Sequence, residues 1–449
     1  MKYFGTDGFR GEANKNLNVY HAFKIGRFIG DYFSTKNNGH GKILIGKDTR
    51  RSSYMFEDAL SAGITSSGSN AHLLHVTPTP SVSYITRTED FDCGIMITAS
   101  HNPYNDNGIK IINKNGEKME DEFLYKLEEY IDSKIEDIDL AVGEDIGRTV
   151  DYIGGRNRYI AYLIQTVTKS FEGIKVGLDC ANGAAFTIAK PVYDALGADT
   201  FVINAEPNGF NINRDAGSTH IDSLRKYVVE NKLDLGFAFD GDCDRCIAVD
   251  NEGNIIDGDS ILYILANFMK KDGALDSNTV VTTVMSNIGL YKAFDDLGIK
   301  YEKTDVGDKN VHDRMYEKDI ELGGEQSGHI IIKKFANTGD GILTSLKIME
   351  AMIESKSDLK SLVRDLKIYP QVLINVKVKD KNTVLDNEYV KASVEKIEKE
   401  LEDSGRVLVR KSGTEPLIRV MVEAETEEIA NQSAMEIVNT IKENGLCLD

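Results

Sequence analysis

GIMITASHNPYNDNGIK (residues 94–110) begins as a short apolar run and ends in a polar loop that contains glycine. The run from Ile95 to Ile97 has the length and composition of a buried strand. Ser100 and His101 follow directly, where the chain has to leave the sheet. Because open α/β sheets bind ligands beyond the carboxyl ends of their strands, this stretch predicts a strand that presents polar side chains to a ligand.

The same succession of apolar run and polar loop recurs along the chain. In a first block, KILIG (42–46) and LLHV (73–76) alternate with helical periodicity. IKVGLDCANG (174–183) and LGFAFDGDCDR (236–245) form a second block, and TVVTTVMSN (279–287) opens a third. This alternation is typical of βαβ units around mostly parallel sheets, so we expect an α/β fold.

The last part of the chain, beginning at Pro370, has a different pattern. RVLVR (406–410) and LIRVMVE (417–423) are strand-like runs on either side of the loop KSGTEP. Apolar residues recur at helical spacing before and after them, from Val390 to Leu401 and again beyond Ala430. These features predict a small C-terminal α+β domain with one loop of functional interest.

Composition excludes several functional classes. The chain has 449 residues, more than one hydrophobic core usually serves, and its net charge is −19. Basic blocks are lacking, so a nucleic-acid binder is not expected. No apolar stretch is long enough for a membrane helix, and MKYFGTDGFRGE at the N-terminus does not resemble a signal peptide. We therefore expect a cytoplasmic protein, which would have to bind an anionic substrate through local clusters of cations.

The five cysteines are too few and too irregularly spaced for a disulfide framework. Cys243 and Cys246 form one CxxC pair, but no second pair stands at the spacing of a zinc finger. We interpret them as small residues beside a charged loop rather than as a zinc or redox site.

That charged loop, DGDCDR (240–245), predicts a metal site. Asp240, Asp242 and Asp244 would repel one another unless a cation lies between them, and Mg²⁺ prefers oxygen ligands. An EF-hand does not fit, because Arg245 and Asn251 stand where glycine and glutamate are required. A solvated acidic turn is the alternative, but the buried-type run LGFAF before the loop argues against it.

Ser100 is a candidate phosphoryl carrier. A serine at a strand end is often only a cap, and the chain lacks the GxSxG elbow of an α/β-hydrolase. His101 lies beside it, and Lys110 can return a positive charge to the same loop. A serine flanked by cations near a metal favours phosphoryl transfer over acyl transfer, since a phosphoserine carries up to about two negative charges.

Two further loops offer groups suited to a phosphosugar. GGEQSGH (323–329) is dense in hydrogen-bonding groups that could orient a sugar, although an ordinary glycine-rich loop remains an alternative. RKSGTEPLIR (410–419) lacks the P-loop pattern, but its arginines and hydroxyls around a glycine predict an anion-binding site. The alternative is that this loop is an ordinary solvated surface. GTDGFRG (5–11) is a weaker candidate for anion binding.

Together these stretches resemble the α-D-phosphohexomutase superfamily, and most closely its phosphoglucosamine mutase branch. TASHNPYNDNGIK resembles the phosphoserine loop, DGDCDR the magnesium loop, GGEQSGH the sugar-specificity loop and RKSGTEPLIRVMVE the phosphate-binding loop. GTDGFRGEAN and GKDTR (46–50) also resemble that branch. The likeness extends from residue 4 to about residue 425.

The resemblance implies four domains around a central cleft: three related α/β domains with mixed, mostly parallel sheets, and a small C-terminal α+β domain. We place the boundaries at 1–152 (phosphoserine loop), 153–253 (magnesium loop), 254–368 (sugar-recognition loop) and 369–449 (phosphate binding). The small domain would close over the substrate. The sequence is compatible with a homodimer but does not determine the oligomeric state.

The resemblance also implies roles for individual residues. Ser100 would carry the phosphoryl group and, with Asp240, Asp242 and Asp244, would ligate one Mg²⁺. The transferring phosphoryl would be surrounded by His101, Lys110, Arg10 and Arg245, among which the sequence does not assign the acid and base. Sugar hydroxyls would meet Glu325, Ser327 and His329, and the distal phosphate would meet Arg410, Ser412, Gly413, Thr414 and Arg419.

Two positions depart from the family pattern. Cys243 replaces the usual small Gly or Ala in the magnesium loop. Lys309 replaces an Arg common in the VGDR segment, and a lysine cannot supply a planar two-pronged contact. The phosphate or sugar contact expected at that position is therefore not carried over to this chain.

The implied reaction is the interconversion of glucosamine 6-phosphate and glucosamine 1-phosphate through glucosamine 1,6-bisphosphate, which would supply amino sugar for UDP-N-acetylglucosamine and the cell wall. A phosphomannomutase or phosphoglucomutase is the alternative within the superfamily, and Gln326 favours the amino sugar. Outside this reaction class, a catalytically dead sugar-phosphate binder would have lost Ser100 or the aspartates, and a Mg²⁺ phosphatase would release inorganic phosphate.

Overall fold

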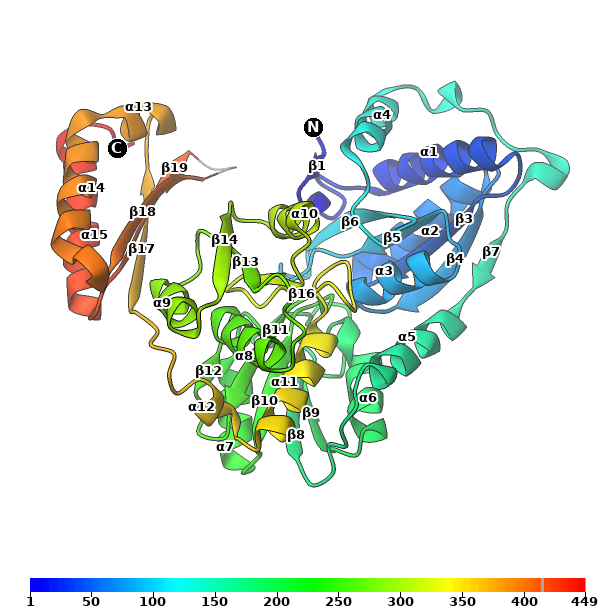
Figure 1. Cartoon of the computed structure of the whole chain (residues 1–449). Coiled ribbons are helices and arrows are strands. Elements are labelled where there is room, and N and C mark those ends of the chain that lie inside the picture. The colour runs from blue at the N-terminus through cyan, green and yellow to red at the C-terminus, as the bar shows by residue number, and fades with distance from the viewer. Residues whose placement is uncertain (413–415, 449) are drawn as a thin grey trace. The chain divides into compact units, whose positions relative to one another are not determined.

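The computed structural model describes residues 1–412 and 416–448 of the chain (Figure 1). The chain separates into two compact units, each with its own core. One unit comprises Met1–Met285 and Ile299–Arg364, and the other comprises Ser286–Gly298 and Asp365–Asp449. Among the described residues, no helix is long and apolar enough to span a membrane.

The first sheet of the larger unit has the strand order β1-β2-β6-β5-β3-β4-β7. Its strands are β1 (Phe4–Gly5), β2 (Gly8–Glu12), β3 (Lys42–Lys47), β4 (Asn70–Val76), β5 (Cys93–Ile97), β6 (Asp106–Asn113) and β7 (Thr149–Asp151). The helices that accompany it are α1 (Val19–Asn37), α2 (Arg51–Thr65), α3 (Thr79–Thr88) and α4 (Asp121–Asp132).

Both faces of this sheet are covered by helices. Ile95 and Ile97 of β5 belong to the core that α1, α2 and α4 form on one face, whereas Met96 packs with α3 on the other. Successive side chains of a strand point to opposite faces, so a strand that is covered on both sides is apolar throughout. This explains the uninterrupted apolar runs of the sequence and confirms the predicted strands at 42–46, 73–76 and 94–98.

The second sheet has the order β12-β11-β10-β8-β9 and the third the order β14-β13-β15-β16. Their strands are β8 (Lys175–Asp179), β9 (Asp199–Ile203), β10 (Leu235–Phe239), β11 (Cys246–Asp250), β12 (Ile255–Ile256), β13 (Thr279–Thr283), β14 (Lys300–Thr304), β15 (Leu322–Gly324) and β16 (Ile330–Ile332). The accompanying helices are α5 (Ile153–Gln165), α6 (Ala189–Ala195), α7 (Asp222–Glu230), α8 (Gly258–Lys271), α10 (Asp308–Lys318), α11 (Gly341–Ser355) and α12 (Leu359–Leu362).

The three sheets share one local arrangement. β3 pairs in parallel with β5, β8 with β10, and β13 with β15. In each case the second strand of the pair is followed by a loop and an antiparallel strand, namely β6, β11 or β16. The sheets are therefore mixed, and the predicted kinship of the three α/β domains is visible in this repeated hairpin.

The smaller unit is built on the antiparallel sheet β17-β19-β18. Its elements are β17 (Gln371–Lys377), β18 (Arg406–Lys411), β19 (Leu417–Glu423), α13 (Lys381–Asp386), α14 (Glu388–Leu401) and α15 (Glu427–Glu443). Val390 and Ile397 of α14 and Ala434 of α15 lie in its core, as the helical spacing predicted. Short 3₁₀ helices complete the chain at η1 (Ile135–Asp137), η2 (Gly143–Asp145), η3 (Ala184–Thr187) and η4 (Glu402–Ser404).

One helix that precedes the C-terminal segment also belongs to the smaller unit. α9 (Ile288–Leu297) follows β13 in the sequence, yet it is bound to the C-terminal sheet. The Glu423 carboxylate accepts a hydrogen bond from the Ile288 N–H at 2.9 Å and forms a two-pronged ion pair with Arg406. The Asn287 amide donates to the Tyr369 carbonyl at 2.9 Å.

Candidate active site

Three loops in equivalent positions of the three sheets meet in the larger unit. The β5–β6 loop carries Ser100, the β10–β11 loop carries the three aspartates, and the β15–β16 loop carries Glu325. The first two touch where the Ser100 hydroxyl donates to the Asp240 carboxylate, with an Oγ–Oδ2 distance of 2.7 Å. The second and third are joined by a backbone bridge between Arg245 and His329. The structure thus brings together side chains that are up to about 230 residues apart in the sequence, as strand-end placement predicts.

Ser100 is held in an uncommon backbone conformation. Its φ of 51° lies in the left-handed region, which a residue with a side chain adopts only when its surroundings require it. Its N–H donates to the Thr98 hydroxyl at 2.9 Å, and its Oγ lies 3.3 Å from Nδ1 of His101. The residue is 1% exposed, so the hydroxyl is presented to Asp240 rather than to bulk solvent.

A buried arginine, Arg50, holds the loop around Ser100. Arg50 donates to the backbone carbonyls of Ser100 and Asn102, each at 2.9 Å, and to that of Asp106 at 3.1 Å. The Asp48 carboxylate in turn accepts from Nε of Arg50 at 2.8 Å. One guanidinium therefore satisfies several carbonyls of a turn that no strand partner could satisfy.

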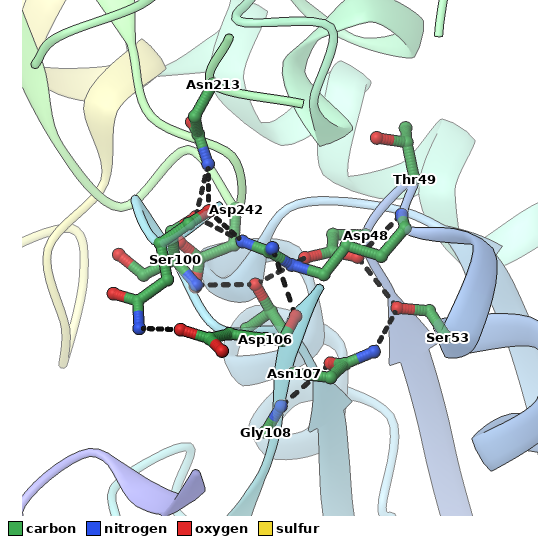
Figure 2. A network of polar contacts seen from close by, with 12 residues as sticks. Asp48, Thr49, Ser53, Ser100, Asp106, Asn107, Gly108, Asn213 and Asp242 are labelled. Carbon is green, nitrogen blue, oxygen red and sulfur yellow. Dashed lines mark hydrogen bonds and ion pairs between the residues drawn. The ribbon is translucent and has the colours of Figure 1, made fainter. Parts of the chain in front are cut away.

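The second domain also contributes to the support of this loop. The Asn213 amide donates to the carbonyls of Ser100 and Asn102 at 2.8 and 3.1 Å (Figure 2). Gly241 allows the two loops to approach, because a Cβ at this position would lie 2.6 Å from the Ser100 carbonyl oxygen. A side chain at position 241 would therefore push Ser100 away from Asp240.

The three aspartates fit a divalent cation. One carboxylate oxygen of each of Asp240, Asp242 and Asp244 lies within 4.8 Å of those of the other two, and all three residues are buried. Oδ1 of Asp242 and Oδ1 of Asp244 are buried and have no hydrogen-bond partner among the described residues. Unpaired buried oxygens are costly, so a hard cation that prefers oxygen ligands would satisfy them.

The charges within the triad are strongly unequal. Burial, followed by repulsion from Asp244 and Asp242, raises the pKa of Asp240 well above its usual range. Burial also acts on Asp244, but Lys110, His329 and Arg245 outweigh it and lower the pKa of this carboxyl to about 2. A cation between the carboxylates would allow all three to be ionised together.

Lys110 offsets part of this negative charge. It projects from β6, and its ammonium lies 2.8 Å from Oδ2 of Asp242 and 3.1 Å from Oδ2 of Asp244. Burial disfavours its charged form, but these two carboxylates raise its pKa above the usual value, so it remains a cation. Thr79, at the start of α3, donates to the same oxygen of Asp242 at 2.5 Å.

The other residues predicted to surround the transferring group lie on the same side of the larger unit. Arg10 lies on β2, 3.4 Å from Asp7, and Nε atoms of both Arg10 and Arg245 are buried with no hydrogen-bond partner in the described part of the chain. Burial, and then the charges of Arg245 and Arg10, lower the pKa of His101 to about 4. His101 is therefore neutral near pH 7, and the cationic character of the site comes from lysine and arginine.

The predicted sugar loop is anchored to the segment that precedes α10. The Glu325 carboxylate accepts a hydrogen bond from the Gly307 N–H at 3.0 Å, and Ser327 is exposed. His329 is buried, and its Nε2 accepts from the Gly339 N–H at 3.2 Å. The amide of Gln326 lies 3.3 Å from the Asp257 carboxylate at the N-terminus of α8. Gln326 is thus engaged by α8, which weakens the interpretation that it reads the sugar directly.

The predicted phosphate cradle lies in the smaller unit. Arg410 on β18 and Arg419 on β19 are directly opposite each other in the antiparallel ladder. Like charges in this position are destabilising unless an anion lies between them, so the pairing supports a phosphate site. Ser412 is buried at the end of β18, whereas Gly413 and Thr414 lie outside the described residues.

The structure shows what surrounds the two positions that depart from the family pattern. Cys243 has a φ of 58° and is fully buried, and burial with the nearby Asp340 raises the pKa of its thiol well above the usual value. Cys246 is buried in β11, and both thiols are free. Buried thiols whose pKa is raised are typically unreactive. Lys309 forms an ion pair with Asp313 at 2.8 Å on the surface of α10.

Several residues of this centre did not emerge from the sequence as functional groups. Arg50 and Thr79 stand at strand ends, in GKDTR and TPTP, but nothing in those stretches shows what they touch. Asp7 lies in the GTDGFRG stretch and Asp308 in TDVGDKN (304–310), and Lys118 forms an ion pair with each, at distances of 3.7 and 2.5 Å. Their position at the end of a glycine-containing turn was the available indication.

Comparison with known proteins agrees with this geometry. Models of the phosphoglucomutase/phosphomannomutase family match the chain in four consecutive parts: α/β/α domain I at residues 1–137, domain II at 157–253, domain III at 257–369 and the C-terminal domain at 373–440. The chain belongs to this family. Phosphohexomutases are enzymes of the isomerase class, and the family membership confirms the predicted fold of three α/β domains and a small C-terminal domain.

Within the phosphohexomutases, the chain resembles proteins named phosphoglucosamine mutase. It is 59% identical to that of Lachnoclostridium phytofermentans and 58% identical to that of Lachnospira eligens, with 99% of each chain covered. The protein of the same name from Bacillus cytotoxicus is 47% identical, with 98% of each chain covered. These relatives place the chain in the phosphoglucosamine mutase branch, as the four motifs indicated.

Solved structures share the fold. A phosphoglucomutase/phosphomannomutase family protein from Burkholderia thailandensis has a TM-score of 0.81 at 20% identity, covering 99% of this chain and 97% of that one. The N-acetylphosphoglucosamine mutase of Aspergillus fumigatus, solved with GlcNAc-6P and magnesium, has a TM-score of 0.69 at 17% identity, covering 99% and 96%. At identities of 20% and 17%, these two structures show only that this phosphohexomutase shares their fold.

Proposed function

We propose that this phosphohexomutase interconverts glucosamine 6-phosphate and glucosamine 1-phosphate, with Ser100 as the residue that lends and reclaims a phosphoryl group. The observation that carries the proposal is the hydrogen bond of 2.7 Å from the Ser100 hydroxyl to Asp240, inside a group of three buried carboxylates beside Lys110. Full-length relatives named phosphoglucosamine mutase support the choice of substrate.

One Mg²⁺ held by Ser100 and the three aspartates would stabilise negative charge on the transferring group. The chain itself supplies the remaining charge and the orientation. Lys110 stays cationic beside the triad, and Arg10 and Arg245 carry buried guanidinium groups whose Nε atoms have no partner within the described chain. Anionic phosphoryl oxygens would satisfy such donors, and the overall charge of −19 makes local cations necessary.

In this mechanism phosphorylated Ser100 transfers its phosphoryl group to the free hydroxyl of glucosamine 6-phosphate. The resulting glucosamine 1,6-bisphosphate reverses its orientation and returns its other phosphate to the Ser100 hydroxyl. Glu325 and Ser327 orient the sugar hydroxyls, and Arg410, Ser412 and Arg419 hold the phosphate that does not react. The burial of Ser100 would keep water from hydrolysing its phosphoryl group.

The proposal is tested by intact-mass measurement followed by assays on Ser100→Ala. We expect a fraction of the wild-type protein to carry one phosphoryl group, and we expect Ser100→Ala to carry none and to lose turnover. Ser361→Ala, which alters an exposed serine of α12, is the control and should behave as wild type. Full turnover by Ser100→Ala would refute the mechanism.

A substrate panel tests the choice of sugar. Glucosamine 6-phosphate should be turned over better than the phosphates of glucose and mannose, because 46–59% identity relates the chain to phosphoglucosamine mutases. Faster turnover of a hexose phosphate would favour the phosphoglucomutase alternative. Stoichiometric release of inorganic phosphate would instead indicate a phosphatase.

A further inference from the structure

A cavity of about 670 Å³ in the larger unit opens beside the aspartate triad. Lys110, Asp244 and His329 lie on its wall at the triad, and Asp7 and Asp308 lie on the same wall. The cavity thus continues from the place where phosphoryl transfer is proposed to a region that contains two additional carboxylates. Neither carboxylate belongs to the proposed metal site or to the sugar-hydroxyl contacts.

Asp308 keeps one carboxylate oxygen available to this cavity. Its Oδ1 accepts from Lys118 at 2.5 Å and from the Lys309 N–H at 2.8 Å. Its Oδ2 makes no hydrogen bond to the described residues and lies 3.7 Å from Nε2 of His329. Burial alone would raise the pKa of Asp308, but Lys118 and His329 outweigh it and lower the pKa, so the carboxylate is ionised.

Asp308 is fixed next to the residue proposed to hold the sugar. The N–H of Gly307, immediately before Asp308, donates to Oε1 of Glu325 at 3.0 Å. Asp308 is the first residue of α10, so its backbone is fixed by the helix and by that contact. The backbone therefore places Asp308 next to the residue that would meet the sugar hydroxyls.

Lys118 neutralises part of the negative charge of this wall, but Oδ2 of Asp308 remains an unpaired acceptor among the described residues. A site that only had to bind a neutral sugar with one or two phosphates would be weakened by further carboxylates, because they repel phosphate. His329 lines the same cavity, is 3% exposed, and has a buried Nδ1 with no hydrogen-bond partner in the described chain. Because Nε2 of His329 accepts from Gly339, its Nδ1 is a donor that a ligand oxygen would satisfy, whereas Oδ2 of Asp308 would accept a hydrogen bond from a ligand N–H.

We propose that Asp308 binds the 2-ammonium group of glucosamine phosphate and is the residue that selects the amino sugar over neutral hexoses. The inference rests on the proposed function and adds a named residue to it. A charge-assisted hydrogen bond from ammonium to Oδ2 would favour the amino sugar, whereas a 2-hydroxyl gains only a neutral hydrogen bond there. The preference arises at Asp308 rather than at Gln326, whose amide faces Asp257.

The test compares Asp308→Asn with wild type on glucosamine 6-phosphate and glucose 6-phosphate, at saturating Mg²⁺ and with glucose 1,6-bisphosphate as activator. Asparagine keeps the size of the side chain and removes the charge. We expect kcat/KM for the amino sugar to fall on the order of 10- to 100-fold and kcat/KM for the hexose to stay within about threefold, so that their ratio falls. An unchanged ratio, or an equal loss on both substrates, would overturn the proposal.

Two control variants separate specificity from folding. Asp313→Asn removes another carboxylate of the cavity wall, one that is paired with Lys309, and should leave the ratio unchanged. Lys118→Met removes the ion pair of Asp308 but keeps the carboxylate, so any loss should be similar for the two sugars and the ratio should not fall. If Lys118→Met lowered the ratio as much as Asp308→Asn does, the sugar preference would depend on the Lys118–Asp308 ion pair and not on a contact with the ammonium group.

The outcome also separates this inference from the proposed function. Wild-type protein that prefers glucose 6-phosphate would refute the substrate assignment whatever Asp308→Asn does. Wild-type protein that prefers glucosamine 6-phosphate, together with an unaltered preference in Asp308→Asn, would leave the function intact and refute the role of Asp308 alone.

Discussion

The Arg50 guanidinium donates a hydrogen bond of 2.9 Å to the Ser100 carbonyl, and both residues are almost fully buried. This contact links the end of β3 to the loop after β5. Because Ser100 has a φ of 51°, the loop does not keep this conformation through its own preference. Arg50 is therefore a positioning residue: it fixes where the Ser100 hydroxyl lies without touching the transferring group itself.

Arg50→Lys should lower kcat roughly 10- to 100-fold with little change in KM, because a lysine cannot bond several carbonyls at once and a small displacement of the nucleophile is costly. Steady-state kinetics on the phosphorylated enzyme would measure this. Arg51→Lys changes the adjacent, exposed arginine and should have no effect. A rise in KM with unchanged kcat would show that Arg50 acts on substrate binding instead.

The hydrogen bond from Thr79 to Asp242 leads to a prediction about metal affinity. Thr79→Val keeps the shape of the side chain. It removes the hydrogen bond of 2.5 Å that the Thr79 hydroxyl donates to Oδ2 of Asp242. Residues that orient a metal ligand typically contribute 10- to 100-fold to affinity, so the Mg²⁺ concentration for half-maximal activity should rise by roughly this factor.

Ser81→Ala is the matched control for this Mg²⁺ titration. Its hydroxyl is also buried in α3, but it accepts a hydrogen bond from Thr77 and does not contact the triad. Equal Mg²⁺ requirements in Thr79→Val and Ser81→Ala would mean that Thr79 serves only the packing of the helix.

The opposed arginines of the smaller unit lead to a prediction about substrate binding. Arg419→Ala should raise KM about 10- to 100-fold, because the fork of Arg419 would hold the phosphate that does not react. Since that phosphate is held equally before and during transfer, kcat should change much less. Lys377→Ala, which removes an exposed cation from the neighbouring strand β17, should leave KM unchanged. An equal rise in KM in both variants would show that Arg419 contributes only to the overall positive charge of the sheet and makes no specific contact with the phosphate.

Much of the fold follows from the sequence because its strands are covered on both faces. The run from Ile95 to Ile97 is apolar throughout for this reason, and its polar successor Ser100 could be placed at the ligand edge. The direction of β6, β11 and β16 could not be read in the same way. An apolar run looks the same in a parallel and an antiparallel strand, so the repeated hairpin appears only in the structure.

The candidate site shows a similar division. Ser100 and the three aspartates were predictable because they lie in polar loops that directly follow buried, apolar strands. The roles of Arg50, Asn213 and Asp308 were not, since each depends on a partner that is brought near only by folding: Arg50 and Asn213 on the carbonyls of the Ser100 loop, and Asp308 on Glu325 through Gly307. Tertiary contacts of this kind leave no local pattern in the sequence.

Asp340 should make the stability of the larger unit depend on pH. This carboxylate caps α11 through the Leu343 N–H at 2.9 Å and accepts the Tyr159 hydroxyl at 2.7 Å. It is 2% exposed, and burial raises its pKa from 3.8 to about 6. Between these values the folded state binds more protons than the unfolded state, so this contribution falls as the pH rises through the window.

Asp340→Asn removes the titration while keeping a side chain that can cap the helix. Relative to this variant, the wild type should lose about 2 to 3 kcal/mol of stability between pH 4 and pH 7, so the difference between their unfolding midpoints should change steadily across that range. Asp358→Asn is a control of opposite sign: hydrogen bonds from the Ser361 side chain and backbone lower the pKa of this exposed N-cap, so its contribution grows as the pH rises. Parallel midpoint curves for wild type and Asp340→Asn would show that the pKa of Asp340 is the same in the folded and unfolded states, so that its two hydrogen bonds offset the effect of burial.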